Sequence, residues 1–271
     1  MIHKRVDIKV GKEGKARLET YFLENFPEVD KKRIRPVVLL CPGGAYEFTS
    51  DREAEAVAVQ FMARGFHACI LRYSVAPAIY PQALLELTAA VSYLRQNHRE
   101  YFLDPNKIIV AGFSAGGHLA ATLGVYWQEK WLEELTGEDR DQYRPNALLL
   151  CYPVITSGEY THVGSMRNLM GKAPSKELKE KLSLEKHVTF AVPPVFMWHT
   201  WDDDCVPVEN SLLFANALRK AGVSLELHLF PHGCHGLSLA NEETKNTNNG
   251  LGVEKNCQIW MELAGAWMKE I

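Results

Sequence analysis

The sequence contains no long apolar run. None of its apolar stretches approaches the roughly 18 residues that a membrane-spanning helix needs. The opening residues Met-Ile-His-Lys-Arg lead into no apolar stretch of the kind found in signal peptides. The sequence therefore predicts a cytoplasmic protein that makes no contact with a membrane.

Cysteine patterns typical of disulfides or zinc are also missing. The chain has six cysteines but no CxxC pair. Cys41, Cys69 and Cys151 lie in or beside apolar runs, where a free thiol behaves as a small hydrophobic side chain. We therefore expect free thiols and no bound metal, and no motif indicates a cofactor.

The sequence has no large excess of positive or negative charge. Lys and Arg number 30 against 33 Asp and Glu, so the net charge of −3 at pH 7 gives no electrostatic reason to expect nucleic acid. With 46% hydrophobic residues in a length of 271, the chain is close to the upper size for one hydrophobic core. We expect a single domain over residues 1–271, with a small, uncharged molecule as its partner.

Short, almost wholly apolar runs recur along the chain, as expected for strands that helices cover on both faces. Apolar residues return every three or four positions between them, for example in 54–61 and 84–94, which is the spacing of a buried helical stripe. Strand and helix alternate from about residue 36, which predicts an α/β fold with a mostly parallel sheet. The predicted strands are residues 37–41, 68–71, 108–111, 147–151 and 195–198.

Two segments depart from this alternation. Residues 6–10 and 17–23 partly alternate and flank Gly11-Lys12-Glu13-Gly14, which predicts an antiparallel hairpin at the sheet edge. Residues 156–192 are polar and too long for a plain loop in a compact domain. We interpret this insertion, at about 156–192, as a small helical cap.

The strongest chemical signal is a GxSxG motif, Gly112-Phe113-Ser114-Ala115-Gly116, between an apolar strand and a helical segment. In a nucleophile elbow the serine occupies a strained turn, so its neighbours must be small, and its Oγ points outward. The helix N-terminus then places the Ala115 N–H beside a developing oxyanion. The alternative is that Ser114 only caps the helix, a position that serine favours.

A serine nucleophile needs a base and a carboxylate, which in this arrangement follow it in the order Ser, Asp, His. Asp202, Asp203 and Asp204 end the apolar strand at 195–198, and the residues alone leave open which of them is the acid. His235, next to Gly236 on a loop after the alternating run 225–230, is our candidate base. His232 is the nearest alternative.

A glycine-rich turn follows the first buried strand in Cys41-Pro42-Gly43-Gly44-Ala45-Tyr46. Consecutive small residues let backbone N–H groups point into a site, as an oxyanion hole requires, and each such donor contributes about 3 kcal/mol to the transition state. By itself the pattern is more often a simple turn. Together with the serine, acid and base, in this order, it predicts a catalytic site.

These motifs resemble the α/β-hydrolase superfamily, and within it the small esterase and acetylesterase-like branch that is related to sugar-ester hydrolases. The resemblance runs from about residue 37 to 239, with the turn at 42–46 where relatives have HGGG and an aromatic residue. It implies an eight-stranded, mostly parallel sheet whose second strand is antiparallel. It also implies Asp203, three residues before Val206-Pro207, as the acid and His235 of the GxHG turn as the base, with Gly44, Ala45 and Ala115 as oxyanion donors.

The expected function is hydrolysis of short-chain acyl esters by a Ser114–His235–Asp203 triad through an acyl-enzyme. The resemblance points to acetylated sugars as one such class of substrate. Tyr46 and Trp201 are candidate substrate-binding rings, although packing is an equal alternative for each. Trp260 and Trp267 fit either the core or the face of a homodimer.

Other functions remain open at this stage. A peptidase or a thioesterase uses the same constellation, and a binding protein without turnover would keep the pocket. A metal hydrolase is disfavoured, because no ligand spacing relates His162, His187 and His232.

Overall fold

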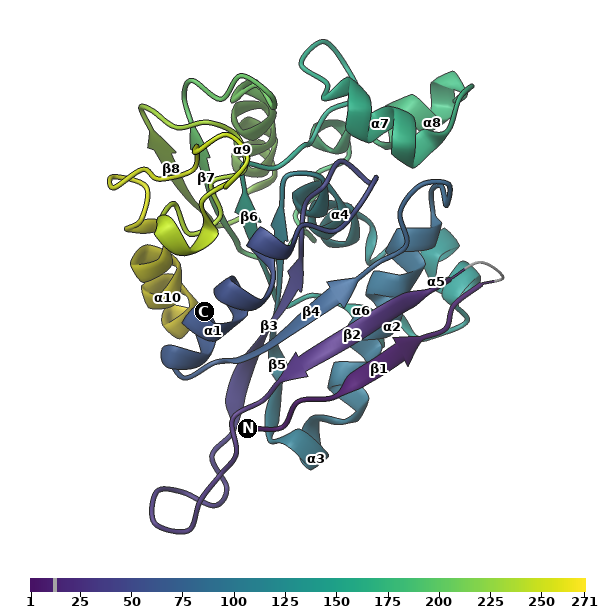
Figure 1. Ribbon diagram of the computed structural model, residues 1–271. Helices are drawn as coiled ribbons and strands as arrows, with labels where there is room; N and C mark the ends of the chain where they lie inside the picture. The colour runs from purple at the N-terminus through teal and green to yellow at the C-terminus, as the bar shows by residue number, and fades with distance from the viewer. Residues whose placement is uncertain (12–13) are drawn as a thin grey trace.

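One twisted sheet of eight strands runs through the computed structural model, which describes residues 1–11 and 14–271 (Figure 1). The strand order is β1-β2-β4-β3-β5-β6-β7-β8, and the strands β3 to β8 pair with one another in parallel. The fold is therefore α/β, as predicted. The strands are β1 Arg5–Ile8, β2 Ala16–Tyr21, β3 Arg35–Cys41, β4 His67–Arg72, β5 Leu103–Phe113, β6 Ala147–Cys151, β7 Val195–Thr200 and β8 Leu225–Phe230.

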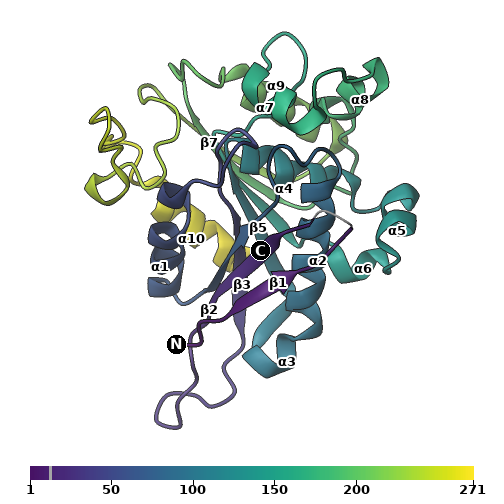
Figure 2. The same cartoon turned by 45° about the vertical axis from the view of Figure 1, so that its right-hand side comes forward.

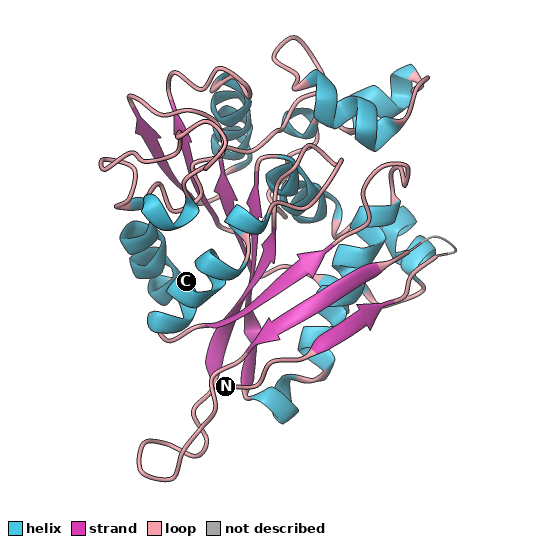
Figure 3. Cartoon of the chain, viewed as in Figure 1, coloured by secondary structure: helices cyan, strands magenta, loops and turns pink. Residues whose placement is uncertain are grey.

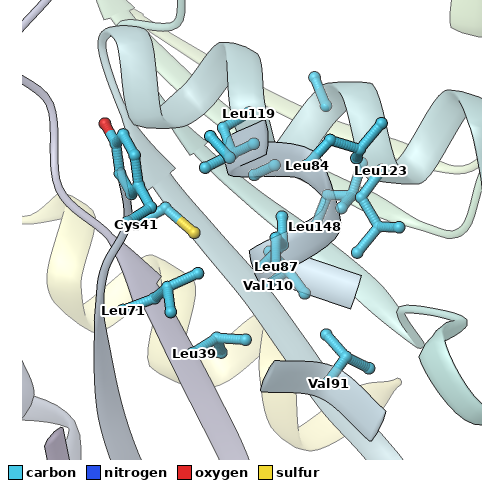
Figure 4. Packing of buried hydrophobic residues seen from close by; sticks show 14 of the residues in the cluster. Leu39, Cys41, Leu71, Leu84, Leu87, Val91, Val110, Leu119, Leu123 and Leu148 are labelled. Atoms are coloured by element: carbon cyan, nitrogen blue, oxygen red, sulfur yellow. The ribbon is translucent and has the colours of Figure 1, made fainter. Parts of the chain in front are cut away.

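The central strands are mostly apolar because both faces of the sheet are buried. Along β3, Leu39 and Cys41 point into one core, whereas Val38 and Leu40 point into a second core on the opposite face. Figure 4 shows the first of these cores, where Leu side chains of two helices pack on the strands. Side chains alternate along a strand, so two covered faces remove the need for polar residues.

Helices form a layer on each side of the sheet (Figures 2 and 3). Helices α1 and α10 cover one face, and α2, α4 and α9 cover the other. Trp260 and Trp267 of α10 are both buried in the core, so neither residue argues for a dimer face. The helices are α1 Glu55–Ala63, α2 Gln82–Gln96, α3 His98–Tyr101, α4 Ala115–Tyr126, α5 Lys130–Thr136, α6 Arg140–Tyr143, α7 Val163–Met170, α8 Lys176–Lys181, α9 Glu209–Ala221 and α10 Trp260–Glu270, with 3-10 turns η1 Asp51–Glu53, η2 Leu184–Lys186 and η3 Glu242–Thr244.

The N-terminal strands form the predicted antiparallel pair at the sheet edge. In the register of β1 and β2, Ile8 lies opposite Ala16, and β2 is also antiparallel to β4. The second strand is therefore the antiparallel one, as the resemblance implied. Lys12 and Glu13 of the predicted turn lie outside the described residues.

The segment between β6 and β7 carries the two helices α7 and α8, at about the place predicted for a cap. Figure 1 shows both helices above the edge of the sheet at which the parallel strands end. Functional groups of α/β sheets gather at this edge. Among the helices that the structure describes, none has the length and apolar character needed to cross a bilayer.

Candidate active site

Ser114 occupies a sharp turn between β5 and α4. Its backbone angles, φ 53° and ψ −118°, fall in a region that non-glycine residues seldom adopt, and such strain is typical of functional sites. A Cβ atom at Gly112 would lie 2.1 Å from the carbonyl oxygen of Gly116, and one at Gly116 would lie 2.0 Å from that of Cys41. The two glycines of the motif therefore allow helix and strand to approach closely enough to form the elbow.

Ser114, His235 and Asp203 lie in one hydrogen-bonded chain. His235 Nε2 is 2.7 Å from Ser114 Oγ, and His235 Nδ1 is 2.7 Å from Asp203 Oδ2. The other carboxylate oxygen, Oδ1, accepts hydrogen bonds from the N–H groups of Cys205 at 3.0 Å and Val206 at 2.9 Å. The side chain of Asp203 is fully buried, so these bonds hold the carboxylate in a single orientation.

The three adjacent aspartates have different surroundings. Only Asp203 points inward toward His235. Asp202 lies at the surface, where it accepts hydrogen bonds from His232 Nδ1 at 2.9 Å and from the Gly233 N–H at 2.8 Å. Asp204 is exposed. The structure thus brings Asp203 to Ser114 and keeps the alternative base, His232, with Asp202.

Asp203 is held in its ionised form. Burial raises the pKa of this carboxyl, but hydrogen bonds from His199 and His235 outweigh that effect, and the pKa lies well below its usual value. His199 Nε2 faces both Asp203 Oδ2 at 3.2 Å and the Val206 carbonyl at 3.0 Å. A carbonyl can only accept, so Nε2 carries a proton, and Nδ1 lies 2.8 Å from the Ser211 hydroxyl, which fixes the orientation of the ring. His199 is therefore a second, fully buried donor to the carboxylate.

The glycine-rich turn after β3 lies beside Ser114. Gly44 and Ala45 line the same pocket as Ser114, and both have positive φ, with Ala45 at 54°. The Gly43 N–H donates to the Glu53 carboxylate at 2.7 Å and is unavailable to a substrate. Among the described residues, no acceptor is assigned to the N–H groups of Gly44, Ala45 and Ala115. The structure brings these three predicted donors around the serine.

The pocket that contains Ser114 is small. Its volume is about 200 Å³, below the range of roughly 300–1,000 Å³ that is usual for small-molecule sites. Its lining joins the serine elbow, the glycine turn, the histidine loop and the cap. The lining residues are Gly44, Ala45, Phe48, Ser50, Arg52, Glu53, Ser114, His162, Cys205, His235 and Gly236.

The two predicted substrate-binding rings do not line this pocket. Tyr46 is 2% exposed, and its hydroxyl is hydrogen-bonded to His118 Nδ1 at 3.0 Å within the core. Its assignment to substrate is therefore corrected to packing, because the left-handed backbone of the turn directs the ring inward. Trp201 is 60% exposed and lies outside the pocket lining. The exposed aromatic residue at the pocket is Phe48.

Glu53 was not identified from the sequence. This buried residue accepts hydrogen bonds from the Gly43 N–H and from the Tyr152 hydroxyl, both at 2.7 Å. The Tyr152 hydroxyl accepts the Ser238 N–H at 2.8 Å, and the Tyr152 ring lies edge-on to His235, with ring centroids 5.2 Å apart. Glu53 therefore links the glycine turn to the histidine loop. Its only sequence signal is a charged residue shortly after that turn.

We expect Glu53→Ala to lower the free energy of unfolding by about 2 kcal/mol or more, because it leaves two buried donors without an acceptor. Chemical denaturation, followed by fluorescence, measures this change. Glu55→Ala is the matched control, since Glu55 is exposed in the first turn of α1, and we expect a change within about 0.5 kcal/mol. Equal stability of the two variants would contradict a structural role for the Glu53 carboxylate.

The fold and the arrangement of serine, histidine and aspartate define an α/β hydrolase. More specifically, residues 25–218 match the BD-FAE family, and the chain belongs to that family. The chain is 40% identical over 214 residues to "Endo-1,4-beta-xylanase B" of Butyrivibrio fibrisolvens, covering 77% of this chain and 33% of that protein. It spans 33% to 57% of the length of the first curated relatives that it matches.

Two crystal structures are similar over nearly the whole chain. The acetyl ester-xyloside bifunctional hydrolase of Caldicellulosiruptor lactoaceticus is 36% identical, with a TM-score of 0.81 and coverage of 94% of this chain and 88% of the other. The carboxylesterase Cest-2923 of Lactobacillus plantarum WCFS1 is 29% identical, with a TM-score of 0.89 and coverage of 100% and 98%. The similar structures thus include esterases that match this chain in length as well as in fold.

Proposed function

We propose that this chain is a serine-dependent carboxylic ester hydrolase that acts on short-chain acyl esters, with acetylated sugars as its substrate class. The observation that carries the proposal is the hydrogen-bonded chain from Ser114 through His235 to the buried Asp203. Similarity to an acetyl ester-xyloside bifunctional hydrolase and to a carboxylesterase supports the choice of substrate class.

In the proposed mechanism, Ser114 Oγ attacks the ester carbonyl while His235 Nε2 takes its proton. Asp203 holds the proton of His235 on Nδ1 and stabilises the imidazolium that forms. The N–H groups of Gly44, Ala45 and Ala115 receive the developing oxyanion. The imidazolium then protonates the leaving alcohol, which gives an acyl-enzyme on Ser114.

Deacylation repeats these steps with water as the nucleophile. His235 takes a proton from the water as it attacks the acyl-enzyme, and the same N–H groups receive the second oxyanion. The tetrahedral intermediate then collapses, Ser114 leaves with the proton from His235, and the carboxylic acid is released. The protonation states at the end equal those at the start, so the cycle needs no other reactant.

The size of the pocket leads to a prediction about the acyl group. We expect kcat/KM for an acetyl ester to exceed that for a decanoyl ester by at least about tenfold, because a pocket of about 200 Å³ excludes a long chain. A panel of p-nitrophenyl acetate, butyrate and decanoate, together with acetylated xylo-oligosaccharides, measures this preference. A preference for decanoate would reject short acyl esters, and turnover of none of these esters would reject the proposed function.

A further inference from the structure

The side chain of His162, which belongs to the cap, lines the same pocket as Ser114. It stands at the N-cap of α7, on the insertion between β6 and β7, and it is half-buried. Burial lowers the pKa of His162, the neighbouring His235 lowers it further, and Asp203 offsets only part of these effects. The ring is therefore neutral at neutral pH and carries one proton.

The position of that proton follows from the contacts of the ring. The Ser165 N–H donates to His162 Nδ1 at 3.2 Å, and the Ser165 hydroxyl lies 2.8 Å from the same nitrogen. A backbone N–H can only donate, so Nδ1 presents its lone pair to Ser165. The single proton of the neutral ring must then be on Nε2. His162 consequently offers a hydrogen-bond donor on the side of the ring away from Ser165.

The Nε2–H group has only a weak partner. Within the part of the chain that the structure describes, its one assigned contact is with Cys205 Sγ, at 3.6 Å, and a thiol sulfur is a poor acceptor. Cys205 also lines the pocket and is exposed. An oxygen atom of a bound substrate would be a better acceptor for this N–H than the thiol is.

The position of His162 indicates which part of a substrate it contacts. Ser114, where the acyl group would bind, is 7% exposed, whereas His162 is only partly buried. Of these two lining residues, His162 therefore lies nearer to the solvent. The alcohol part of a sugar ester continues into solvent, and a sugar carries hydroxyl or ring oxygens next to its ester.

We propose that His162 is a specificity-determining residue whose Nε2–H donates a hydrogen bond to an oxygen of the alcohol part of the ester. This inference rests on the proposed ester hydrolase function. It goes beyond the triad, because it assigns the selection of polyol esters over simple aryl esters to the cap. A p-nitrophenyl ester has no hydroxyl or ring oxygen beside its ester group and so gains nothing from this donor.

His162→Asn tests the assignment. Asparagine is a favoured N-cap that can accept the Ser165 N–H, but its short amide does not carry a donor to the position of Nε2. We expect kcat/KM for a monoacetylated methyl xyloside to fall about 3- to 10-fold, the effect of one neutral hydrogen bond, mainly through a higher KM. For p-nitrophenyl acetate we expect a change of less than about twofold.

Two further variants control the experiment. His162→Gln keeps an N–H donor on a longer side chain and is expected to restore part of the selectivity for the sugar ester. His228→Asn makes the same substitution on β8, where His228 pairs with Glu226 outside the pocket, and both rates should stay unchanged. If His162→Asn fails to fold, the role of His162 is tested by comparing His162→Gln with the unchanged protein on both esters.

The outcomes separate the two proposals. Equal losses on both esters, or no loss on the sugar ester, would overturn the role of His162 while leaving the triad intact. The role of His162 would also be overturned if His162→Gln were no more selective for the sugar ester than His162→Asn. If the unchanged protein hydrolysed neither ester, the proposed function would fall, and the assignment of His162 with it.

Discussion

Ser114→Ala is expected to reduce kcat/KM for p-nitrophenyl acetate by about 10⁴- to 10⁶-fold. The substitution removes the atom that forms the acyl-enzyme in the proposed mechanism, and also the hydrogen bond to His235 Nε2. Water attack assisted only by the remaining N–H donors accounts for the residual rate. The thermal midpoint should change little, because the backbone of the elbow is set by the flanking glycines rather than by the serine hydroxyl.

Steady-state hydrolysis and labelling with a fluorophosphonate measure this prediction together. The unchanged protein should gain the mass of one phosphonyl group, and Ser114→Ala should gain none. Ser175→Ala is the matched control: Ser175 caps α8 in the cap region, where its hydroxyl accepts the Leu178 N–H. Its loss should cost about 1 kcal/mol of stability and leave labelling unchanged. Full turnover by Ser114→Ala would exclude Ser114 as the nucleophile.

Asp203→Asn should lower kcat by about 10⁴-fold. The Asn oxygen would keep the two backbone N–H donors of Cys205 and Val206, which would turn the amide nitrogen toward the histidines. His235 Nδ1 would then have to accept a hydrogen bond, and the proton of the neutral ring would move to Nε2. A protonated Nε2 cannot take the proton of Ser114, so the effect falls mainly on kcat.

The neighbouring aspartates provide matched controls. Asp204→Asn changes an exposed carboxylate and should leave kcat within about twofold. Asp202→Asn disturbs the surface pair with His232, whereas its remaining amide oxygen can still accept the Gly233 N–H, so it should cost no more than a few-fold. Steady-state kinetics of the three single variants therefore tests the assignment directly. A loss of 10⁴-fold in Asp202→Asn or Asp204→Asn, with Asp203→Asn active, would refute the role of Asp203.

Asp203 should also make the free energy of unfolding depend on pH. Its pKa is lower in the folded protein than in the unfolded chain, so its contribution to stability is present above the unfolded value of about 3.9 and is lost as the pH falls below it. The same denaturation curves, recorded between pH 3 and 7, should thus show a shallower acid dependence for Asp203→Asn than for Asp204→Asn.

The sheet and its helices followed largely from local patterns. Wholly apolar runs predicted the parallel strands because a strand buried on both faces has no position for a polar residue, as the alternating cores around Leu39 and Leu40 illustrate. Ser114 and His235 followed from glycine-flanked turns that locate a side chain by backbone geometry alone. Such signals are short-range, and the residues that produce them are adjacent in the sequence.

Tertiary structure decided what depends on distant segments. Tyr46 was a predicted substrate contact, but in the fold its hydroxyl is hydrogen-bonded to His118, 72 positions away in the sequence. No local pattern indicated the roles of Glu53 and His162, because each acquires its role from groups that other elements bring to it: Tyr152 for Glu53, and the Ser114 pocket for His162.

The sequence by itself thus determined the class of fold and predicted the candidate nucleophile and its candidate base, because glycine spacing and strand patterns are local constraints on the backbone. The choice of Asp203 from three adjacent aspartates needed more than such constraints, since consecutive side chains point in different directions and only one of them meets His235. The size of the pocket and the orientation of the cap donor depended entirely on the tertiary structure, because segments distant in sequence build both.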